Sequence, residues 1–287
     1  MNQILRFLPA LRVHSWGGFG SQLFTAYVVL KLKRRFPNRR IKVVVHTSGV
    51  TRRVSEFDFE TLGVKIIQVE DYKSPKGQNS VYKPRMHFFY NVPIVMRRYI
   101  FRILKWLRFV QSANTDPSFN LISPWTLSIR GHYTRLAFDR LIVESLYRVI
   151  FPTESHYIAQ KETLVIHYRL GDLLHLGEKW PINPKRVEGA LKTFRAYSKY
   201  PILLSDSREE ELTEFFENST ILRFSKPLNY SPIKTLRICI EAESFVGTGA
   251  KISLWAAVFR YFVYEKESSL PTELKWTGVN GLKAIWY

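Results

Sequence analysis

The feature that most constrains the fold is the alternation of short apolar runs with helix-forming segments in the second half of the chain. Apolar runs predict strands at 163–170, 201–206, 219–224 and 244–249. Helices are expected to begin near Pro184, to span 208–217 and 232–242, and to begin again near residue 252. Strands that alternate with helices of this length indicate βαβ units and a parallel sheet. The chain is therefore predicted to be an α/β protein.

The first half of the chain shows the same alternation less regularly. Strands are expected at 11–16, 41–46 and 64–69, with a helix over 21–36 that ends before Pro37. Residues 71–93 and 114–125 are expected to be irregular connections. The two halves join near 151–162, which predicts two Rossmann-like lobes with a cleft between them, residues 1–155 and 156–287. A single sheet with a long insertion is the alternative.

Polar residues follow three of the expected strands, where ligands bind in parallel sheets. The first is HYRLGD (167–172), in which His167 and Arg169 leave the same face of the strand and Gly171 permits a sharp turn. A guanidinium at this point can grip a phosphate with two parallel hydrogen bonds. Asp172 can orient that guanidinium or accept a proton. The alternative is a structural Arg–Asp pair that caps the strand.

The ends of the next two strands also carry groups suited to a nucleotide. Thr248 and Gly249 end one strand, and Lys251 and Ser253 enter the next helix, a combination that suits a diphosphate. Asp206, followed by Ser207, ends another strand and could bind a base or ribose. The alternative for that pair is an ordinary helix N-cap, and this alternative is favoured.

A glycine corner near the N-terminus, GGFGSQLF (17–24), lies where a strand meets a helix. The free N–H groups of such a corner could bind an anion. The candidate contacts are Gly18, Phe19, Gly20, Ser21 and Gln22. The alternative is a plain backbone turn, because the spacing is not that of a dinucleotide-binding GxGxxG motif.

The charge of the chain predicts a polyanionic partner. Its 287 residues hold 43 Lys and Arg against 24 Asp and Glu, a net charge of +19. Nucleic acid, an anionic membrane and phosphorylated substrates are the classes that such an excess attracts. The single cysteine, Cys239, excludes an internal disulfide. We expect neither a signal peptide nor a spanning helix, and a cytoplasmic location.

The most basic amphipathic stretch is 96–110, MRRYIFRILKWLRFV. At helical spacing its cations share one arc and most apolar residues, Trp106 among them, lie opposite. A basic helix with an aromatic apolar face is typical of elements that lie on membranes. The predicted membrane contacts are Arg97, Arg98, Arg102, Lys105, Trp106 and Arg108. The alternative is a core-facing helix whose basic side is merely solvated.

Four segments in order resemble the bacterial α-1,2-fucosyltransferase family and its superfamily. They are GGFGSQLF, HYRLGD, LLSDS and GTGAKISLWAA, which span residues 17 to about 260. HYRLGD is the most specific of them. The chain departs from the family pattern at Ser21, where the family has Asn, and at 250–255, where one hydroxyl pair and one Trp are lost.

The resemblance implies a GT-B-like fold and an inverting transferase without an obligatory metal or other cofactor. Its C-terminal lobe would bind a GDP-sugar, and its N-terminal lobe would face the acceptor. Arg169 would hold the β-phosphate, and Asp206 would bind the nucleoside. Lys251 and Ser253 would line the phosphates. The backbone at 18–22 would close over the donor. GDP-fucose or a relative such as GDP-colitose is the expected donor.

The reaction expected is transfer of a 6-deoxysugar to a glycan hydroxyl, with an α-1,2 linkage, in the synthesis of bacterial surface polysaccharide such as O-antigen. The acceptor would be a glycan linked to lipid diphosphate, at the inner face of the bacterial inner membrane. Asp172 is the first candidate for the general base and His167 the next. Two alternatives stay open: a basic nucleic-acid- or membrane-binding protein without transferase activity, and a non-catalytic family member.

Overall fold

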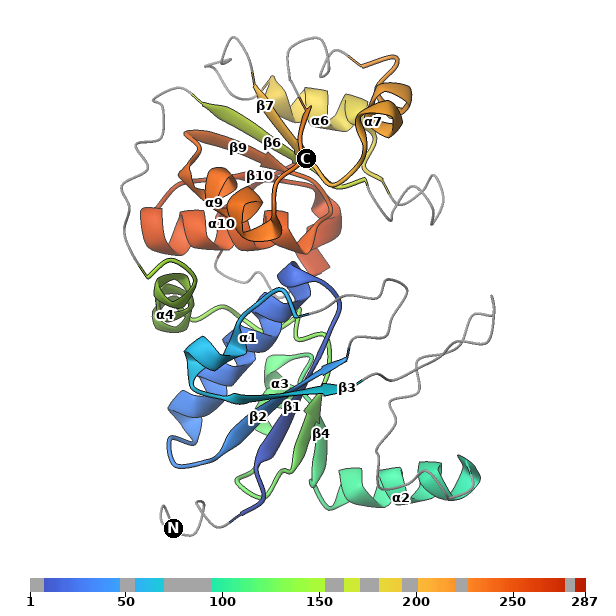
Figure 1. Ribbon diagram of the computed structural model, residues 1–287, viewed down its shortest axis with the longest axis vertical. Coiled ribbons are helices and arrows are strands. Elements are labelled where there is room, and N and C mark those ends of the chain that lie inside the picture. The colour runs from blue at the N-terminus through green and yellow to red at the C-terminus, as the bar shows by residue number, and fades with distance from the viewer. Residues whose placement is uncertain are drawn as a thin grey trace. The chain divides into compact units, whose positions relative to one another are not determined.

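The computed structural model describes residues 8–46, 55–69, 94–152, 163–170, 181–192, 201–219, 227–276 and 282–287. The chain divides into two compact units, Met1–Ala137 and Phe138–Tyr287. Each unit contains its own parallel sheet (Figure 1). This arrangement confirms the predicted α/β class and the pair of Rossmann-like lobes, and it rules out the single sheet with a long insertion.

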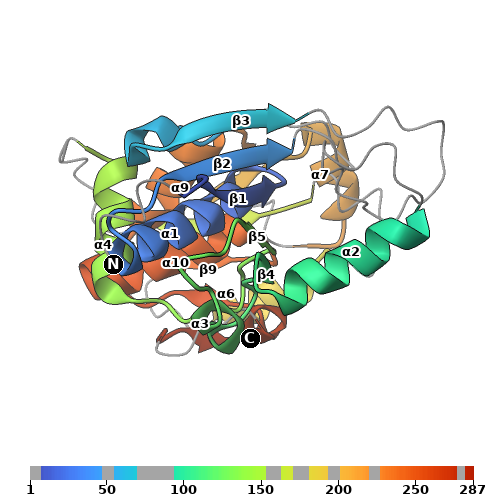
Figure 2. The same cartoon turned by 90° about the horizontal axis from the view of Figure 1, so that it is seen from below.

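The first unit is built on an apolar parallel sheet with β1 at its centre. Its described strands are β1 (Leu11–Trp16), β2 (Ile41–His46), β3 (Lys65–Val69), β4 (Val110–Ser112) and β5 (Ser128–Arg130). Its helices are α1 (Phe19–Arg35), the 3-10 turn η2 (Phe59–Leu62), α2 (Ile94–Trp106) and α3 (Asp116–Asn120). The strand order is β3-β2-β1-β5-β4, so β4 forms one edge. Helix α2 extends beyond that edge (Figure 2).

The second unit follows the βαβ alternation that the sequence predicts. Its described strands are β6 (Leu164–Tyr168), β7 (Ile202–Ser205), β8 (Pro227–Leu228), β9 (Ser244–Gly247), β10 (Ser269–Leu270) and β11 (Ile285–Trp286). Its helices are α4 (Arg140–Ile150), α6 (Pro184–Leu191), α7 (Glu209–Phe215), α9 (Pro232–Glu241), α10 (Lys251–Tyr264) and the 3-10 turn η4 (Thr272–Trp276). The strand order is β11-β10-β9-β6-β7-β8, and all pairs are parallel.

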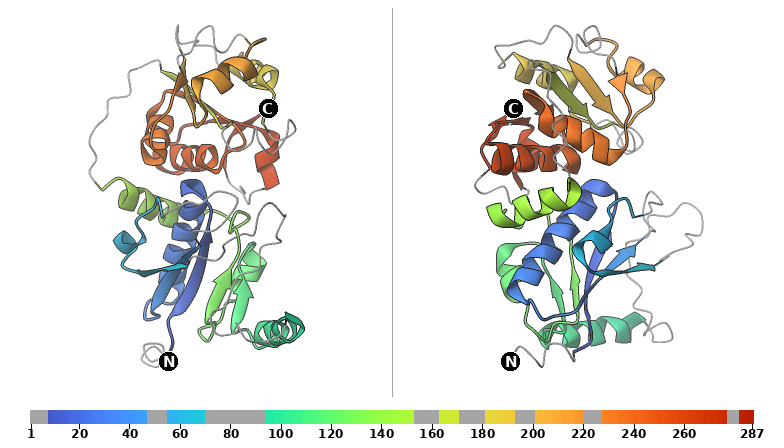
Figure 3. Two further views of the ribbon diagram at one scale, coloured as in Figure 1. Left: turned by 45° about the vertical axis from the view of Figure 1, so that its right-hand side comes forward. Right: turned by 60° about the vertical axis from the view of Figure 1, so that its left-hand side comes forward.

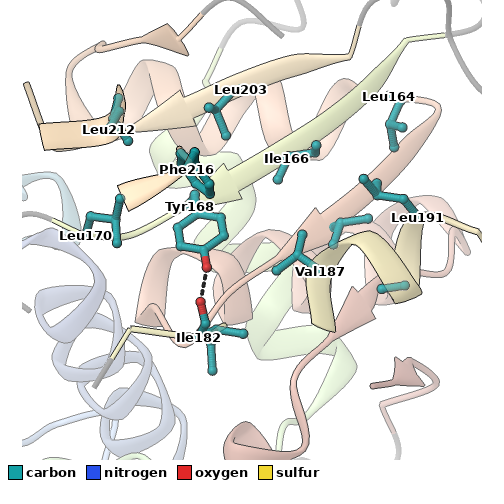
Figure 4. Close-up of a cluster of buried hydrophobic side chains, with 12 residues drawn as sticks. Leu164, Ile166, Tyr168, Leu170, Ile182, Val187, Leu191, Leu203, Leu212 and Phe216 are labelled. Atoms are coloured by element: carbon teal, nitrogen blue, oxygen red, sulfur yellow. Dashed lines mark hydrogen bonds between the residues drawn. The ribbon is translucent and has the colours of Figure 1, made fainter. Parts of the chain in front are cut away.

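Alternate residues of β6 supply the two faces of this second sheet. Leu164, Ile166 and Tyr168 pack with apolar residues of α6 and α7 in one buried cluster (Figure 4). His167 points to the opposite face, where it meets α10. Because both faces are covered, β6 is buried along its whole length, as is typical of strands in parallel sheets. The helices α9 and α10 lie across the sheet from α6 and α7 (Figure 3).

The division between the units lies earlier than the expected boundary at residue 155. Helix α4 packs on α10, and just before it the Phe138 ring meets Trp255 edge-on, with 5.3 Å between ring centroids. Residues 138–150 therefore belong to the second unit. The amphipathic sequence pattern of residues 138–150 does not indicate which of the two sheets they pack against.

Two further expectations differ from the structure. The stretch 114–125 contains the short helix α3, because Thr115 and Ser118 form a capping box and Pro117 stands in the first turn. Helix α2 ends at Trp106, so Arg108 lies beyond the helix and Val110 is a buried residue of β4. The segments 71–93 and 220–224 lie outside the described residues.

Candidate functional site

The candidate site lies at the carboxyl ends of β6 and β9. From β6 the chain proceeds to β7 and β8 on one side, and then returns to β9 on the other side of β6. Ligands of open α/β sheets bind where the strand order reverses in this way. Arg169 directly follows β6, and Thr248, Gly249 and Ala250 directly follow β9. The topology therefore brings HYRLGD and GTGAK, two separate sequence motifs, to one point.

Thr248 joins these two loops through its hydroxyl. Its Oγ1 accepts a hydrogen bond from the Arg169 N–H at 3.0 Å and donates one to the His167 carbonyl at 3.1 Å. The Thr248 N–H also donates to the His167 carbonyl at 3.1 Å. Since Thr248 is buried, it fixes the backbone that carries Arg169. We therefore assign Thr248 the role of positioning the Arg169 backbone. The structure does not present the Thr248 side chain as the contact with the sugar nucleotide that the sequence predicts.

Lys251 adds a second cation close to Arg169. It is the first residue of α10, and the N-cap Ala250 supplies no side-chain hydrogen bond. Burial, together with the positive charge of Arg169, lowers the pKa of Lys251 to about 8. Partial burial of two like charges at a helix N-terminus favours binding of an anion, because the anion would offset their repulsion.

His167 and Ser253 lie beneath the sheet and bind each other. The distance between His167 Nδ1 and Ser253 Oγ is 2.7 Å, and the two side chains are 4% and 0% exposed. Burial lowers the pKa of His167 to about 4; the charge of Asp206 opposes this shift, and the charge of Arg169 adds slightly to it. The pair attaches β6 to α10, so the structure supports neither His167 as a base nor Ser253 as a phosphate contact.

Asp206 connects the end of β7 to the end of β6. Its Oδ1 accepts a hydrogen bond from the Leu170 N–H at 3.0 Å, while the residue as a whole stays exposed. Asp206 therefore lies beside the Arg169 loop, and its role as a nucleoside contact stays a prediction. Ser207 is buried and its N–H donates to Ser205 Oγ at 3.3 Å, so its role as a contact for the sugar nucleotide stays a prediction. Asp172, the first candidate base, lies outside the described residues.

The glycine corner of the first unit is occupied by the chain's own groups. Gly17 has a φ of 81°, a conformation that favours glycine. The Phe19 N–H at the start of α1 donates to the Glu56 carboxylate, which takes the place of the expected external anion. The Gln22 amide oxygen accepts from the N–H groups of Glu56 and Phe57 at 2.9 and 2.8 Å. Gln22 is thus a structural clamp, and its buried side chain is not available to a donor.

The same lobe contains a buried histidine pair that the sequence motifs do not indicate. His14 Nδ1 and His46 Nε2 are 2.7 Å apart, and Ser128 Oγ lies 3.1 Å from His14 Nε2. Burial lowers the pKa of His14 to about 2, with help from Arg130 and His46. The register of β1 and β2 brings these histidines together. The sequence around each histidine does not predict this pair.

The described part of the chain contains neither a metal-binding cluster nor a membrane-spanning helix. No cluster of three or more His, Cys, Asp or Glu there could hold a metal ion. In the same part of the chain, no helix has the length and apolar character needed to cross a bilayer. Independence of metal and the peripheral location both stay predictions.

Comparisons with known proteins add little to this geometry. No protein-family model matches the sequence, and no curated protein matches it significantly. Among solved structures, the E. coli heptosyltransferase WaaC with ADP is 13% identical and matches 96% of this chain and 92% of its own, with a TM-score of 0.44. A family 9 glycosyl transferase from Veillonella parvula is 9% identical, with 98% and 86% covered and a TM-score of 0.40.

A glycosyltransferase from Rickettsia africae is 8% identical, with 92% of this chain and 79% of that chain covered and a TM-score of 0.41. All three are named as glycosyltransferases, and none is named as a fucosyltransferase. TM-scores this low carry no argument about this chain. The assignment to a family therefore stays a prediction from the motifs.

Proposed function

We propose that this protein is a glycosyltransferase that binds the diphosphate of a nucleotide sugar in its second unit. The observation that carries the proposal is the meeting of Arg169 and the N-terminus of α10 at the point where the strand order reverses. Thr248, which lies just before α10, holds Arg169 at this helix terminus through its hydrogen bond to the Arg169 N–H. Lys251 supplies a further cation, so the place combines three features that favour a diphosphate.

In the proposed reaction, the acceptor hydroxyl oxygen attacks the anomeric carbon of the sugar. The bond from that carbon to the diphosphate oxygen breaks, and the nucleoside diphosphate leaves with the electron pair. Arg169 and Lys251 stabilise the negative charge that develops on the leaving group. Attack from the opposite face inverts the anomeric carbon, and a base takes the hydroxyl proton. Asp172 is the proposed base.

The finer assignment rests on the motif resemblance. We propose GDP-fucose or a related GDP-6-deoxysugar such as GDP-colitose as the donor, with Asp206 near the nucleoside. The proposed acceptor is a hydroxyl of a lipid-diphosphate-linked glycan, joined by an α-1,2 bond during synthesis of bacterial surface polysaccharide. No metal or other cofactor is required in this proposal.

The test is to incubate the protein with a panel of nucleotide sugars and to measure which nucleotide is released. GDP-sugars are expected to release GDP, slowly to water and faster with a suitable glycan. Release from UDP- or ADP-sugars in preference to GDP-sugars would overturn the donor assignment but keep the transferase. If no nucleotide sugar is bound or consumed, and the protein binds oligonucleotides in a salt-sensitive way, the transferase proposal is wrong.

A further inference from the structure

Helix α2 presents apolar side chains to solvent along one stripe. The stripe consists of Met96, Tyr99, Ile103 and Trp106, which are 56%, 66%, 41% and 80% exposed. Their spacing of three or four residues places them on one face of the helix. Leu107, which directly follows, is 45% exposed. The alternative of a core-facing apolar side is therefore wrong for this stripe, and an exposed apolar surface of this kind marks an interaction site.

Positive charge lies next to this apolar stripe and behind it: Arg102 borders it, four residues before Trp106, whereas Lys105 lies on the other side of the helix, four residues after Phe101. Arg102, Lys105 and Arg108 are exposed. The neighbouring sequence adds no negative charge, because residues 72–115 contain no Asp or Glu. The side chains of Arg97 and Arg98, also expected to contact a membrane, lie outside the described residues.

The opposite side of α2 attaches the helix to the edge of the first sheet. Phe101 is half-buried, and the Arg130 guanidinium of β5 lies 5.7 Å from the centre of its ring. Beyond the helix, the Phe109 carbonyl accepts hydrogen bonds from the N–H groups of Leu127 and Ser128 at 2.8 and 3.1 Å. The stripe thus lies on the side of α2 that is not anchored, and Figure 3 shows the helix at the margin of its unit.

The end of α2 holds an arginine in a conformation that glycine prefers. Arg108 has a φ of 60°. Its N–H donates to the Lys105 carbonyl at 3.1 Å, and the Phe109 N–H donates to the Leu104 carbonyl at 2.9 Å, which is a Schellman motif. Arginine is less stable than glycine in this conformation, and its exposed side chain adds positive charge at the C-terminal end of α2.

We propose that α2 docks the protein on an anionic phospholipid bilayer. The helix would lie in the plane of the surface, with the stripe among the acyl chains and the cations against the headgroups. Ile103 and Met96 favour a bilayer over a nucleic acid, because aliphatic side chains gain by entering hydrocarbon and have no comparable partner on a phosphate backbone. This docking surface is separate from the proposed diphosphate site and does not depend on it.

The test is sedimentation of the full chain with vesicles of phosphatidylcholine, with and without phosphatidylglycerol. We expect binding only to the anionic vesicles, and weaker binding at high salt. Removal of two cations in Arg102→Gln/Lys105→Gln is expected to weaken binding by roughly fivefold per charge. The matched control, Lys65→Gln/Lys192→Gln, removes the same charge from exposed positions outside α2 and is expected to have a clearly smaller effect.

Two further variants separate docking from folding. Arg108→Gly is expected to weaken vesicle binding without lowering thermal stability, because glycine accepts the φ of 60°. Trp106→Phe is expected to reduce the blue shift of tryptophan emission that anionic vesicles cause in the unmodified protein. The proposal is overturned if α2 variants and the control lose binding equally, if vesicles do not bind, or if the α2 variants lose oligonucleotide binding instead.

Discussion

Thr248 Oγ1 accepts a hydrogen bond from the Arg169 N–H at 3.0 Å and returns one to the His167 carbonyl at 3.1 Å. One buried hydroxyl thereby joins the loop after β6 to the loop after β9. The two sequence motifs that contain these residues are about 80 positions apart, and each suggested a phosphate contact by itself. Their connection makes a single site of them.

Thr248→Val is predicted to disturb this site more than the fold. Valine keeps the shape of threonine but leaves the Arg169 N–H without its acceptor, which costs about 1–3 kcal/mol of stability. We expect a raised KM for the donor, measured with a nucleotide-release assay. Thr248→Ser is the control, since it retains the hydroxyl and should restore most of the donor affinity. Equal KM values for the valine and serine variants would contradict the positioning role.

The lowered pKa of Lys251 predicts that nucleotide binding depends on pH. Its pKa in the free protein is about 8, below the ordinary value of 10.5. A diphosphate binds the cationic form, so GDP affinity is expected to be constant below about pH 8 and to fall as the pH rises through it. Calorimetric titration across this range measures the effect. In Lys251→Arg, which stays charged, affinity should not fall over the same range.

The same lysine is predicted to lower the stability of the free protein. Because the pKa is lower in the folded state than in the unfolded state, the cation costs folding free energy below pH 8, and this cost fades between pH 8 and 10.5. Lys251→Met should therefore raise the free energy of unfolding at pH 7 by roughly 1–3 kcal/mol while it weakens GDP binding. Denaturant unfolding provides the measurement, and a destabilised Met variant would speak against this assignment.

Gly247 and Gly249 form a matched pair for testing the packing of β9 on α10. A Cβ added at Gly247 would lie 2.6 Å from the Ser253 Cβ, whereas at Gly249 its nearest neighbour is 3.9 Å away. Gly247→Ala is predicted to destabilise the protein by about 1–3 kcal/mol through overpacking, and Gly249→Ala to leave stability nearly unchanged. Thermal unfolding of both variants distinguishes them. Similar melting temperatures would show that β9 and α10 are not this close.

His167 predicts loss of stability in acid. Burial holds its pKa at about 4, below the ordinary 6.5, so its neutral form contributes stability that is complete above pH 6.5 and is lost as the pH falls toward 4. His167→Gln should flatten the pH dependence of unfolding in this window, by at most about 1.4 kcal/mol per pH unit. His14 titrates in the other unit, so the unmodified protein and a His14→Gln variant are needed as references. An unchanged slope in His167→Gln would contradict the burial of a neutral imidazole.

The strands were predictable where apolar runs were long enough to cross a buried sheet. Residues 164–168 illustrate this, because every residue of β6 is buried and the largely apolar run LVIHY predicts a buried strand. The end of α2 was not predictable in the same way. Arg108 takes the place of the glycine that ordinarily signals a Schellman stop, so the basic amphipathic pattern continues past Trp106 although the helix does not.

The candidate site was predictable only in part, because sequence shows which residues follow a strand but not which way they face. Arg169 and Lys251 lie at the sheet end that the motifs indicate. His167 belongs to the same motif, yet it faces α10 and binds Ser253. Gln22 is occupied by Glu56 and Phe57, which lie more than 30 residues away and carry no local signal.

The most direct test of a diphosphate site at Arg169 is calorimetric titration of GDP into the unmodified protein and Arg169→Ala. Arg237→Ala is the control, because it removes the same charge from α9, where Arg237 pairs with Glu241 at 2.9 Å. Loss of a charged hydrogen bond of about 1.5–3 kcal/mol predicts 10- to 100-fold weaker GDP binding for Arg169→Ala, with little change for the control. Unaltered GDP affinity in a folded Arg169→Ala protein would contradict the account.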